Sequence, residues 1–154
     1  ISKWSWTQHN AFKERYPTRH RGVYLMTQRL QRHPYLATFD GPDTNTSTEI
    51  RTRSTVPLQA LYLLNDPFIQ ETAHAFADRL IAEAPTPDER IALAQEIAWG
   101  RPPRDDEAER ARRYIEAYAS GLNEAGVTAE RLEHEAWAGF AKILLIANEF
   151  LYVE

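Results

Sequence analysis

The stretch RTRSTVPLQALYLLNDPFIQETAHAFADRL, residues 51–80, carries the strongest helix signals of the chain. Pro57 follows a Ser-Thr pair that can cap a helix, and it stands where a first-turn proline is tolerated. Asp66 and Pro67 repeat this pattern, so a second helix is predicted to begin there. Because a residue before proline is biased away from the α region, we expect a bend at Asp66. The stretch predicts two consecutive helices joined at a corner.

Both predicted helices carry apolar residues at helical spacing, which is typical of a face that packs on a core. In the first helix this stripe comprises Leu58, Leu61, Tyr62 and Leu64. In the second it comprises Phe68, Ile69, Thr72, Ala73, Phe76, Ala77 and Leu80. We therefore expect both stripes to be buried.

Polar side chains surround this helix pair and allow two interpretations. In the first, amides and carboxylates cap the helices and satisfy backbone groups at the corner, while the arginines pair with acids or stay in water. In the second, the arginine forks and amides line a pocket for an anion or a polyhydroxylated ligand. The candidate ligand-binding residues are Asp40, Asp43, Asn45, Arg51, Arg53, Gln59, Asn65 and Asp66.

Residues 39–50, FDGPDTNTSTEI, have the composition of a long polar loop. Four of them, Asp40, Asp43, Asn45 and Glu49, offer the hard oxygen ligands that calcium takes. Their spacing does not match an EF-hand loop, and turns held by Asx hydrogen bonds explain the same residues. Calcium is thus a weak candidate, and no other metal-ligand spacing was found.

The chain after Leu80 predicts further helices. Thr86, Pro87 and Glu89 form a capping-box pattern, and GRPP at residues 100–103 is a break. Asp105 and the acids after it suit a helix start, Gly121 is expected to stop that helix, and Thr128 is expected to open the last one. The fold class is mostly α, an irregular bundle of about five to six helices.

Residues 1–20 contain Trp4 and Trp6 in alternation with polar residues, which predicts a short extended N-terminal segment. The tryptophans pack on a core in one interpretation and stack on sugars or bases in the other. The acidic residues at 130, 133 and 135 are interpreted as a solvated helix turn. No phosphate loop, nucleophile elbow or catalytic triad order is present, so the sequence gives no catalytic residue.

Composition sets further bounds. The chain has 154 residues, enough for one domain, with 43% hydrophobic and 26% charged residues. A net charge of −4 argues against general nucleic-acid binding, although residues 13–32 are locally basic. The absence of cysteine excludes disulfides and covalent haem attachment within the chain. No signal peptide or membrane-length apolar run is seen. We interpret residues 1–154 as a single helical domain, the C-terminal fragment of a larger protein.

Three stretches together resemble a known family: residues 39–69, the GRPP of residues 100–103, and NEFLYVE at residues 148–154. The chain is similar to the planctomycete PSD-one family, a domain of unknown function numbered fifteen fifty-three, from about Trp4 to Glu154. Arg104 departs from the family pattern, where a capping Thr or Ser is common, and Asp105 is expected to take over the cap. The family's recurrent positions correspond here to Phe39, Asp40, Asp43, Asn45, Arg51, Thr55, Pro57, Gln59, Ala60, Leu61, Leu64, Asn65 and Asp66.

The resemblance implies the C-terminal part of a large exported protein, periplasmic or at the cell surface, with a cytochrome-c-like domain upstream. It implies no established activity, no cofactor in this segment and haem c in the parent. The favoured hypothesis is an accessory or interaction module whose partners are other domains of that parent. The alternatives are part of a haem-linked enzyme acting on polysaccharide or another envelope substrate, and a binding module for acidic or sulfated sugars.

Overall fold

The computed structural model describes residues 21–24, 34–41, 43, 45, 47 and 57–152, and the fold is given for these residues. They form the 3-10 helix η2 and seven α-helices, which confirms a mostly α fold for the described part of the chain. The chain divides into two compact units, residues 1–59 and 60–154, and each is described by itself. The predicted N-terminal extended segment lies outside the described residues.

The first unit contains η2 (Gly22–Tyr24) and α1 (Pro34–Thr38). Two residues after the last residue of α1, Asp40 has a left-handed backbone with φ of 52°. The N–H of Gly41 then donates to the carbonyl of Leu36 over 2.6 Å. This is the Schellman closure of a helix, in which Asp is one of the few residues other than Gly tolerated at the left-handed position. Asp40 therefore terminates α1.

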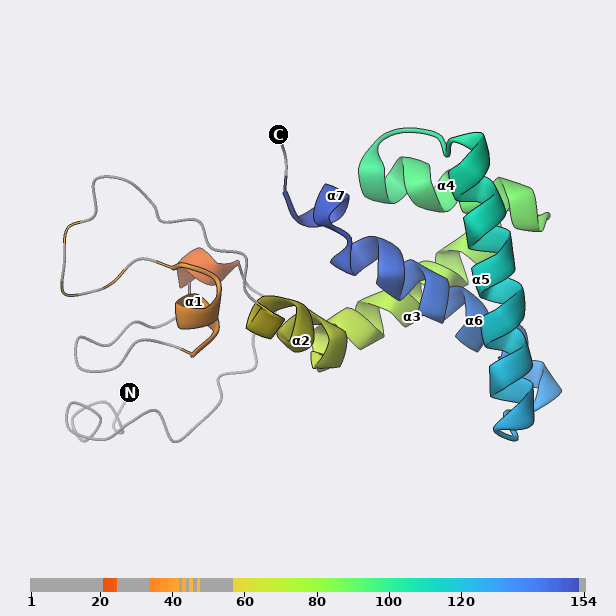
Figure 1. The fold of residues 1–154 in the computed structure, drawn as a ribbon, viewed down its shortest axis with the longest axis horizontal. Coiled ribbons are helices and arrows are strands. Elements are labelled where there is room, and N and C mark those ends of the chain that lie inside the picture. Colours follow the sequence, from red (N-terminus) through yellow and green to blue (C-terminus); the bar gives the residue numbers. More distant parts are fainter. Residues whose placement is uncertain are drawn as a thin grey trace. The chain divides into compact units, whose positions relative to one another are not determined.

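The second unit is a helical bundle (Figure 1). Helix α2 (Pro57–Asn65) leads across Asp66 into α3 (Pro67–Glu83), and α4 (Pro87–Trp99), α5 (Asp105–Glu124), α6 (Ala129–Ile146) and the short α7 (Asn148–Leu151) follow. Helix α6 packs chiefly against α3 and α5, and α4 contacts all three. The core between them is built from Ala77, Leu80, Ile91, Ala94, Ala111, Trp137, Ala138, Phe140 and Leu144.

The predicted helix starts are confirmed where the capping group and its backbone partner are close in sequence. Oδ1 of Asp66 accepts the N–H of Phe68 over 2.8 Å, and Asp66 has an extended backbone that makes the expected corner. Thr86 and Glu89 form the predicted capping box. Gly100 ends α4 in the left-handed conformation, with φ of 73°. These capping residues determine where α3 and α4 begin and where α4 ends.

The prediction that the apolar stripe of α2 is buried was wrong. Leu58, Leu61, Tyr62 and Leu64 are exposed, whereas Leu63 and the polar Gln59 are buried. Helical periodicity identifies an amphipathic element, and which side packs depends on the neighbouring elements. The α3 stripe is buried at Ala73, Ala77 and Leu80 as predicted, but Phe68 at its start is exposed.

Two predictions about α5 were also wrong. Arg104, not Asp105, is the N-cap residue, and its backbone N–H donates to Glu107. Gly121 does not stop the helix, because the cost of an exposed glycine inside a helix is only about 1 kcal/mol relative to alanine. The helix ends at a Schellman motif around Gly126, which has φ of 84°, and the Val127 N–H donates to the Leu122 carbonyl over 3.0 Å.

Gly139 is a point of close helix approach. A methyl group at this position on α6 would overlap the ring of Tyr118 on α5, and that ring stacks on Tyr114 with centroids 5.6 Å apart. We expect Gly139→Ala to lower the free energy of unfolding by about 1–3 kcal/mol through overpacking. In a Tyr118→Ala background the same change should raise it by about 0.5–1 kcal/mol, because alanine is the better helix former. Urea unfolding of the four proteins measures both values, and stabilisation in both backgrounds would contradict the close approach.

Candidate functional site

The acidic candidates of the 39–50 loop take part in local backbone structure. Oδ1 of Asp43 accepts the N–H of Asn45 over 2.9 Å, the hydrogen bond of an Asx turn. Asp40 terminates α1, as described above. Glu49 lies outside the described residues, so the calcium prediction is not tested. The Asx interpretation of Asp43 is confirmed by this hydrogen bond.

The amide and acid candidates at the helix corner also bond to the backbone. Nε2 of Gln59 donates to the carbonyl of Thr38 over 2.9 Å within the first unit. In the second unit, Nδ2 of Asn65 donates to the carbonyl of Leu61 over 2.8 Å, and Asp66 caps α3. Arg51 and Arg53 lie outside the described residues, so the proposed anion pocket stays a prediction.

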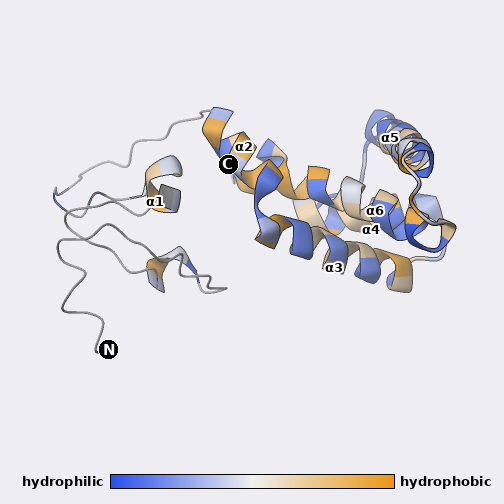
Figure 2. Cartoon of the chain, turned by 90° about the horizontal axis from the view of Figure 1, so that it is seen from below, coloured by the Kyte–Doolittle hydropathy of each residue, from blue (hydrophilic) through white to orange (hydrophobic). Residues whose placement is uncertain are grey.

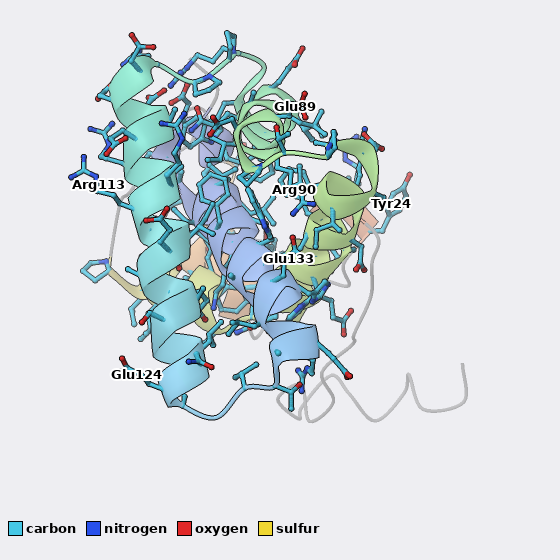
Figure 3. All side chains as sticks on the ribbon, turned by 90° about the vertical axis from the view of Figure 1, so that its right-hand side faces the viewer. Tyr24, Glu89, Arg90, Arg113, Glu124 and Glu133 are labelled. Carbon is cyan, nitrogen blue, oxygen red and sulfur yellow. The ribbon has the colours of Figure 1, made fainter. Side chains whose placement is uncertain are left out.

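The second unit instead has a depression of about 420 Å³ between α4, α5 and α6, which we call the Arg90 depression. Apolar walls and charged rim residues line it: Thr86, Pro87, Asp88, Arg90, Ile91, Arg112, Ile115, Glu116, Glu133 and Trp137. Figure 3 shows two of these residues, Arg90 and Glu133, lying close to each other. The depression therefore combines a packed floor with a charged edge.

Three interactions hold the Arg90 side chain in place. Its Nε donates to the carbonyl of Ala84 at the end of α3 over 2.8 Å, and its Nη1 donates to Glu133 over 2.6 Å. Its guanidinium carbon lies 5.4 Å from the ring centroid of Trp137. At the rim, Arg112 donates to Asp88 over 2.6 Å and holds the pKa of that carboxyl below its usual value. Arg90 on α4 thus connects the end of α3 with α6, and Arg112 connects α5 with α4.

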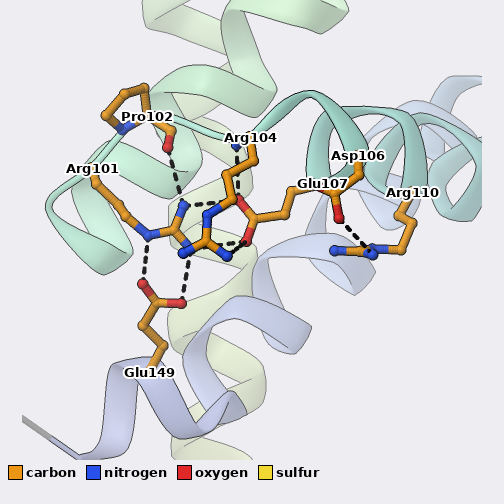
Figure 4. A network of polar contacts seen from close by, with 7 residues as sticks. All are labelled: Arg101, Pro102, Arg104, Asp106, Glu107, Arg110 and Glu149. Carbon is orange, nitrogen blue, oxygen red and sulfur yellow. Dashed lines mark hydrogen bonds and ion pairs between the residues drawn. The ribbon is translucent and has the colours of Figure 1, made fainter.

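A second charged cluster joins α5, α7 and the loop after α4 (Figure 4). Nη1 and Nη2 of Arg101 donate to the two oxygens of Glu107 over 2.8 and 2.9 Å. Its Nε and Nη2 donate to Glu149 over 2.7 and 3.0 Å. The guanidinium carbon also lies 5.3 Å from the ring centroid of Trp99. One arginine thus ties three segments together, and we call this set the Arg101 network.

The Arg101 network shifts the proton affinity of its acids. The Arg101 hydrogen bonds, with the N–H of Arg104, lower the pKa of Glu107 to about 2. Arg101 also lowers the pKa of Glu149, and the two carboxylates raise the pKa of Arg101. Groups held this firmly in the charged form are poor proton donors and acceptors near neutral pH. The network fits a structural clamp better than acid–base catalysis.

One group in the described part of the chain has the composition of a metal-ligand set. His74 on α3 and His134 and Glu135 on α6 offer nitrogen and oxygen atoms that all lie within 4.8 Å of one another. Nε2 of His74 is 4.0 Å from Oε2 of Glu135, and the two imidazole rings stack with centroids 5.3 Å apart. All three side chains are partly buried.

Sequence reasoning missed these clusters for one reason. Arg90 and Glu133 are 43 residues apart, and Arg101 and Glu149 are 48 apart. No short spacing signals such pairs, because they meet only when the helices pack. The acidic turn of α6 was interpreted as solvated, and Glu130 and Glu133 are indeed exposed, although Glu133 also pairs with Arg90. Glu135 is partly buried and pairs with Arg131.

Comparison with known proteins gave one finding. Residues 3–115 match the model of a family described as a protein of unknown function (DUF1553). The match covers α1 to α4 and the first half of α5, and so includes Arg90, Arg101 and His74. No curated protein and no solved structure matches the chain.

Proposed function

The chain belongs to the PSD1 family of proteins of unknown function (DUF1553), and from this premise we propose that it is an accessory helical interaction module of an exported multidomain protein. The observation that supports an interaction role is the run of large apolar side chains that α2 and the first turn of α3 leave exposed. Leu61, Leu64 and Phe68 are 57%, 42% and 53% exposed. Large exposed apolar side chains gathered in one place are typical of protein interaction surfaces. We call these three residues the α2–α3 surface.

The chemistry of the α2–α3 surface favours an apolar partner. Helix α2, PLQALYLLN, has no charged residue, and Figure 2 colours much of it as hydrophobic. Sulfated sugars and nucleic acids are bound through lysine and arginine, which α2 does not offer. We therefore assign this surface to an apolar face of another domain of the same parent protein.

The placement of the arginines supports the same role. Arg90, Arg101 and Arg112 each pair with a carboxylate of the chain itself. Such pairs connect helices, and their cations are already committed to partners within the fold. These charged side chains thus hold the helices of the bundle together. The α2–α3 surface is the part that can contribute binding energy to a partner. In the part of the chain that the structure describes, no helix has both the length and the apolar character to cross a membrane.

The test is a binding experiment between the chain and the separately produced upstream domains of its parent. A variant with Leu61→Gln, Leu64→Gln and Phe68→Gln is expected to bind those domains at least about tenfold more weakly, since central apolar anchors contribute most of the binding energy. Isothermal titration measures both affinities. The variant should fold normally, because changes at exposed sites usually alter stability by about 0.5 kcal/mol or less.

The matched control is Arg113→Gln on α5, an exposed position away from α2. It should bind as the unchanged chain does. If the unchanged chain binds none of the upstream domains, the assignment is wrong. If it forms a dimer that the triple variant abolishes, the partner is a second copy and the assignment to another domain fails.

Export and the haem of the parent rest on the family resemblance. Haem c is attached through the two cysteines of a Cys-x-x-Cys-His motif, and this chain has no cysteine. Its residues do not fit covalent haem attachment, so any haem would belong to another domain. Fractionation of cells that make the parent tests export, and recovery only from the cytoplasm would contradict it.

A further inference from the structure

The contact between α3 and α6 brings two histidines and a carboxylate together on the side of the bundle. His74 lies on α3, and His134 and Glu135 are adjacent on α6. Their possible ligand atoms lie within 4.8 Å of one another. Because α3 and α6 form the most extensive helix contact of the unit, these three side chains are presented from rigid elements.

The donor set has a specific chemistry. Two imidazole nitrogens and one carboxylate oxygen suit borderline divalent ions such as Zn²⁺ and Co²⁺, and not Ca²⁺ or Mg²⁺, which take oxygen ligands. Three protein ligands on a tetrahedral ion leave one position for water or another small ligand. The composition therefore points to a transition-metal site with an open position.

Neighbouring side chains complete the arrangement expected around such a site. Oδ1 of Asp78, one turn after His74, is 2.9 Å from Nε2 of His134. When that nitrogen donates its proton to Asp78, the lone pair of His134 is on Nδ1. A carboxylate that fixes the tautomer of a metal-binding histidine is a common outer-shell partner. Arg131 pairs with Oε1 of Glu135, and Oε2 of that carboxylate lies nearer His74.

The imidazole rings must move to bind an ion. Their planes are only 13° apart, and imidazole lone pairs lie in the ring plane, so two stacked rings cannot both point at one ion. Donors around a tetrahedral Zn²⁺ are about 3.3 Å apart, given bond lengths of about 2.0–2.2 Å. At least one ring must therefore turn about its side-chain bonds when the ion binds. All three side chains are partly exposed, which leaves room for this rotation.

We propose that His74, His134 and Glu135 bind one divalent transition-metal ion of the zinc class, with Asp78 as the outer partner of His134. The site bridges α3 and α6 and therefore couples metal binding to the stability of the bundle. It is independent of the α2–α3 surface, so either assignment can fail without the other.

The test uses the tag-free full chain, stripped with a chelator, at pH 7.5. Titration with Zn²⁺ should give one ion per chain, and Co²⁺ should give the visible absorption bands of a tetrahedral ion with nitrogen and oxygen ligands. His74→Gln, His134→Gln and Glu135→Gln should each weaken binding at least about tenfold. Asp78→Asn should weaken it by about 10- to 100-fold, as loss of an outer-shell partner does.

Two controls separate this site from incidental binding. The chain has five histidines, and a variant with His9, His20 and His33 changed to glutamine should keep full affinity. Glu130→Gln removes an exposed acid from the same helix and should also keep it. Circular dichroism checks each fold, and the exposed Asp78 gives a variant that tests the site without disturbing the core.

The results decide the proposal in either direction. Loss of the stoichiometric Zn²⁺ site in the His74, His134 and Glu135 variants, together with its retention in both controls, supports the site. Absence of Zn²⁺ binding to the unchanged chain overturns it. So does unchanged binding by the His74→Gln and His134→Gln variants, or loss of binding in the triple histidine control.

Discussion

Replacing Trp137 by alanine is expected to lower the free energy of unfolding by about 3–5 kcal/mol, the usual cost of deleting a buried aromatic side chain. Trp137 is 3% exposed and belongs to the core between α3, α4, α5 and α6. It meets Phe140 edge to face, with ring centroids 6.1 Å apart. Its ring also lies beneath the guanidinium of Arg90. The substitution therefore removes packing and leaves a buried arginine without its aromatic contact.

Thermal and urea unfolding of the full chain measure this loss. For a unit of this size the midpoint temperature should fall by roughly 12 °C or more, since each kcal/mol shifts it by about 4–8 °C. Trp137→Phe keeps a ring under Arg90 and much of the volume, so its loss should be smaller. Tyr152→Ala, an exposed aromatic, is the matched control and should cost about 0.5 kcal/mol or less. Equal losses in the Trp137→Ala and Tyr152→Ala variants would show that the core is placed wrongly.

Local signals made the helix boundaries predictable. Thr86 and Glu89 are three residues apart, and Asp66 bonds two residues on, so the groups that interact are already neighbours in the sequence. Such caps depend on groups within one helical turn of each other, so they can be recognised before the packing of the helices is known. The stop at Gly121 failed because glycine only permits a left-handed turn, and the turn formed at Gly126 where two backbone bonds close the helix.

Burial and the charged clusters were less predictable, since both depend on packing. The apolar residues of α2 have the period of a helix, but periodicity does not say which element covers them. The Arg101 network and the His74 cluster join residues that are more than 40 positions apart, and only the helix arrangement brings them together. Gln59, Asn65 and Asp66 bond to backbone groups, as one of the two alternatives for the polar candidates predicted. Asp43 forms the Asx turn that was the alternative to a calcium site.

Arg101→Met is expected to lower the free energy of unfolding clearly more than the loss of an exposed ion pair does, because it removes the charge-assisted hydrogen bonds to both oxygens of Glu107 and to Glu149. The side chain of Glu107 is only 13% exposed, so water can hardly replace Arg101 as its hydrogen-bond partner. Glu149 is more exposed, so water can replace Arg101 there more easily. Arg101→Lys keeps the charge but loses the two-pronged geometry and should give an intermediate loss. Arg113→Met breaks an exposed pair within α5 and should cost about 0.5 kcal/mol or less.

The same network predicts a dependence of stability on pH. Glu107 has a pKa of about 2 in the folded protein, against an ordinary value of 4.5. A carboxyl whose pKa is lowered by folding stabilises the fold fully above its unfolded value, and this contribution is lost as the pH falls toward the folded value. The stability that Arg101 and Glu107 provide should therefore be complete above about pH 5 and disappear between about pH 4.5 and 2.

Urea unfolding of the unchanged chain and of Glu107→Gln, from pH 7 to pH 2.5, isolates this contribution. Other carboxylates with lowered pKa, such as Asp88, act in the same direction in both proteins, so the difference between the two curves belongs to Glu107. That difference should be largest near neutral pH and should shrink as the pH falls below 4.5, because a protonated Glu107 no longer accepts both hydrogen bonds of Arg101 as a charged group. A difference that stays constant down to pH 2.5 would mean that Glu107 stabilises the loop before α5 through packing, and that the charge of Arg101 contributes little.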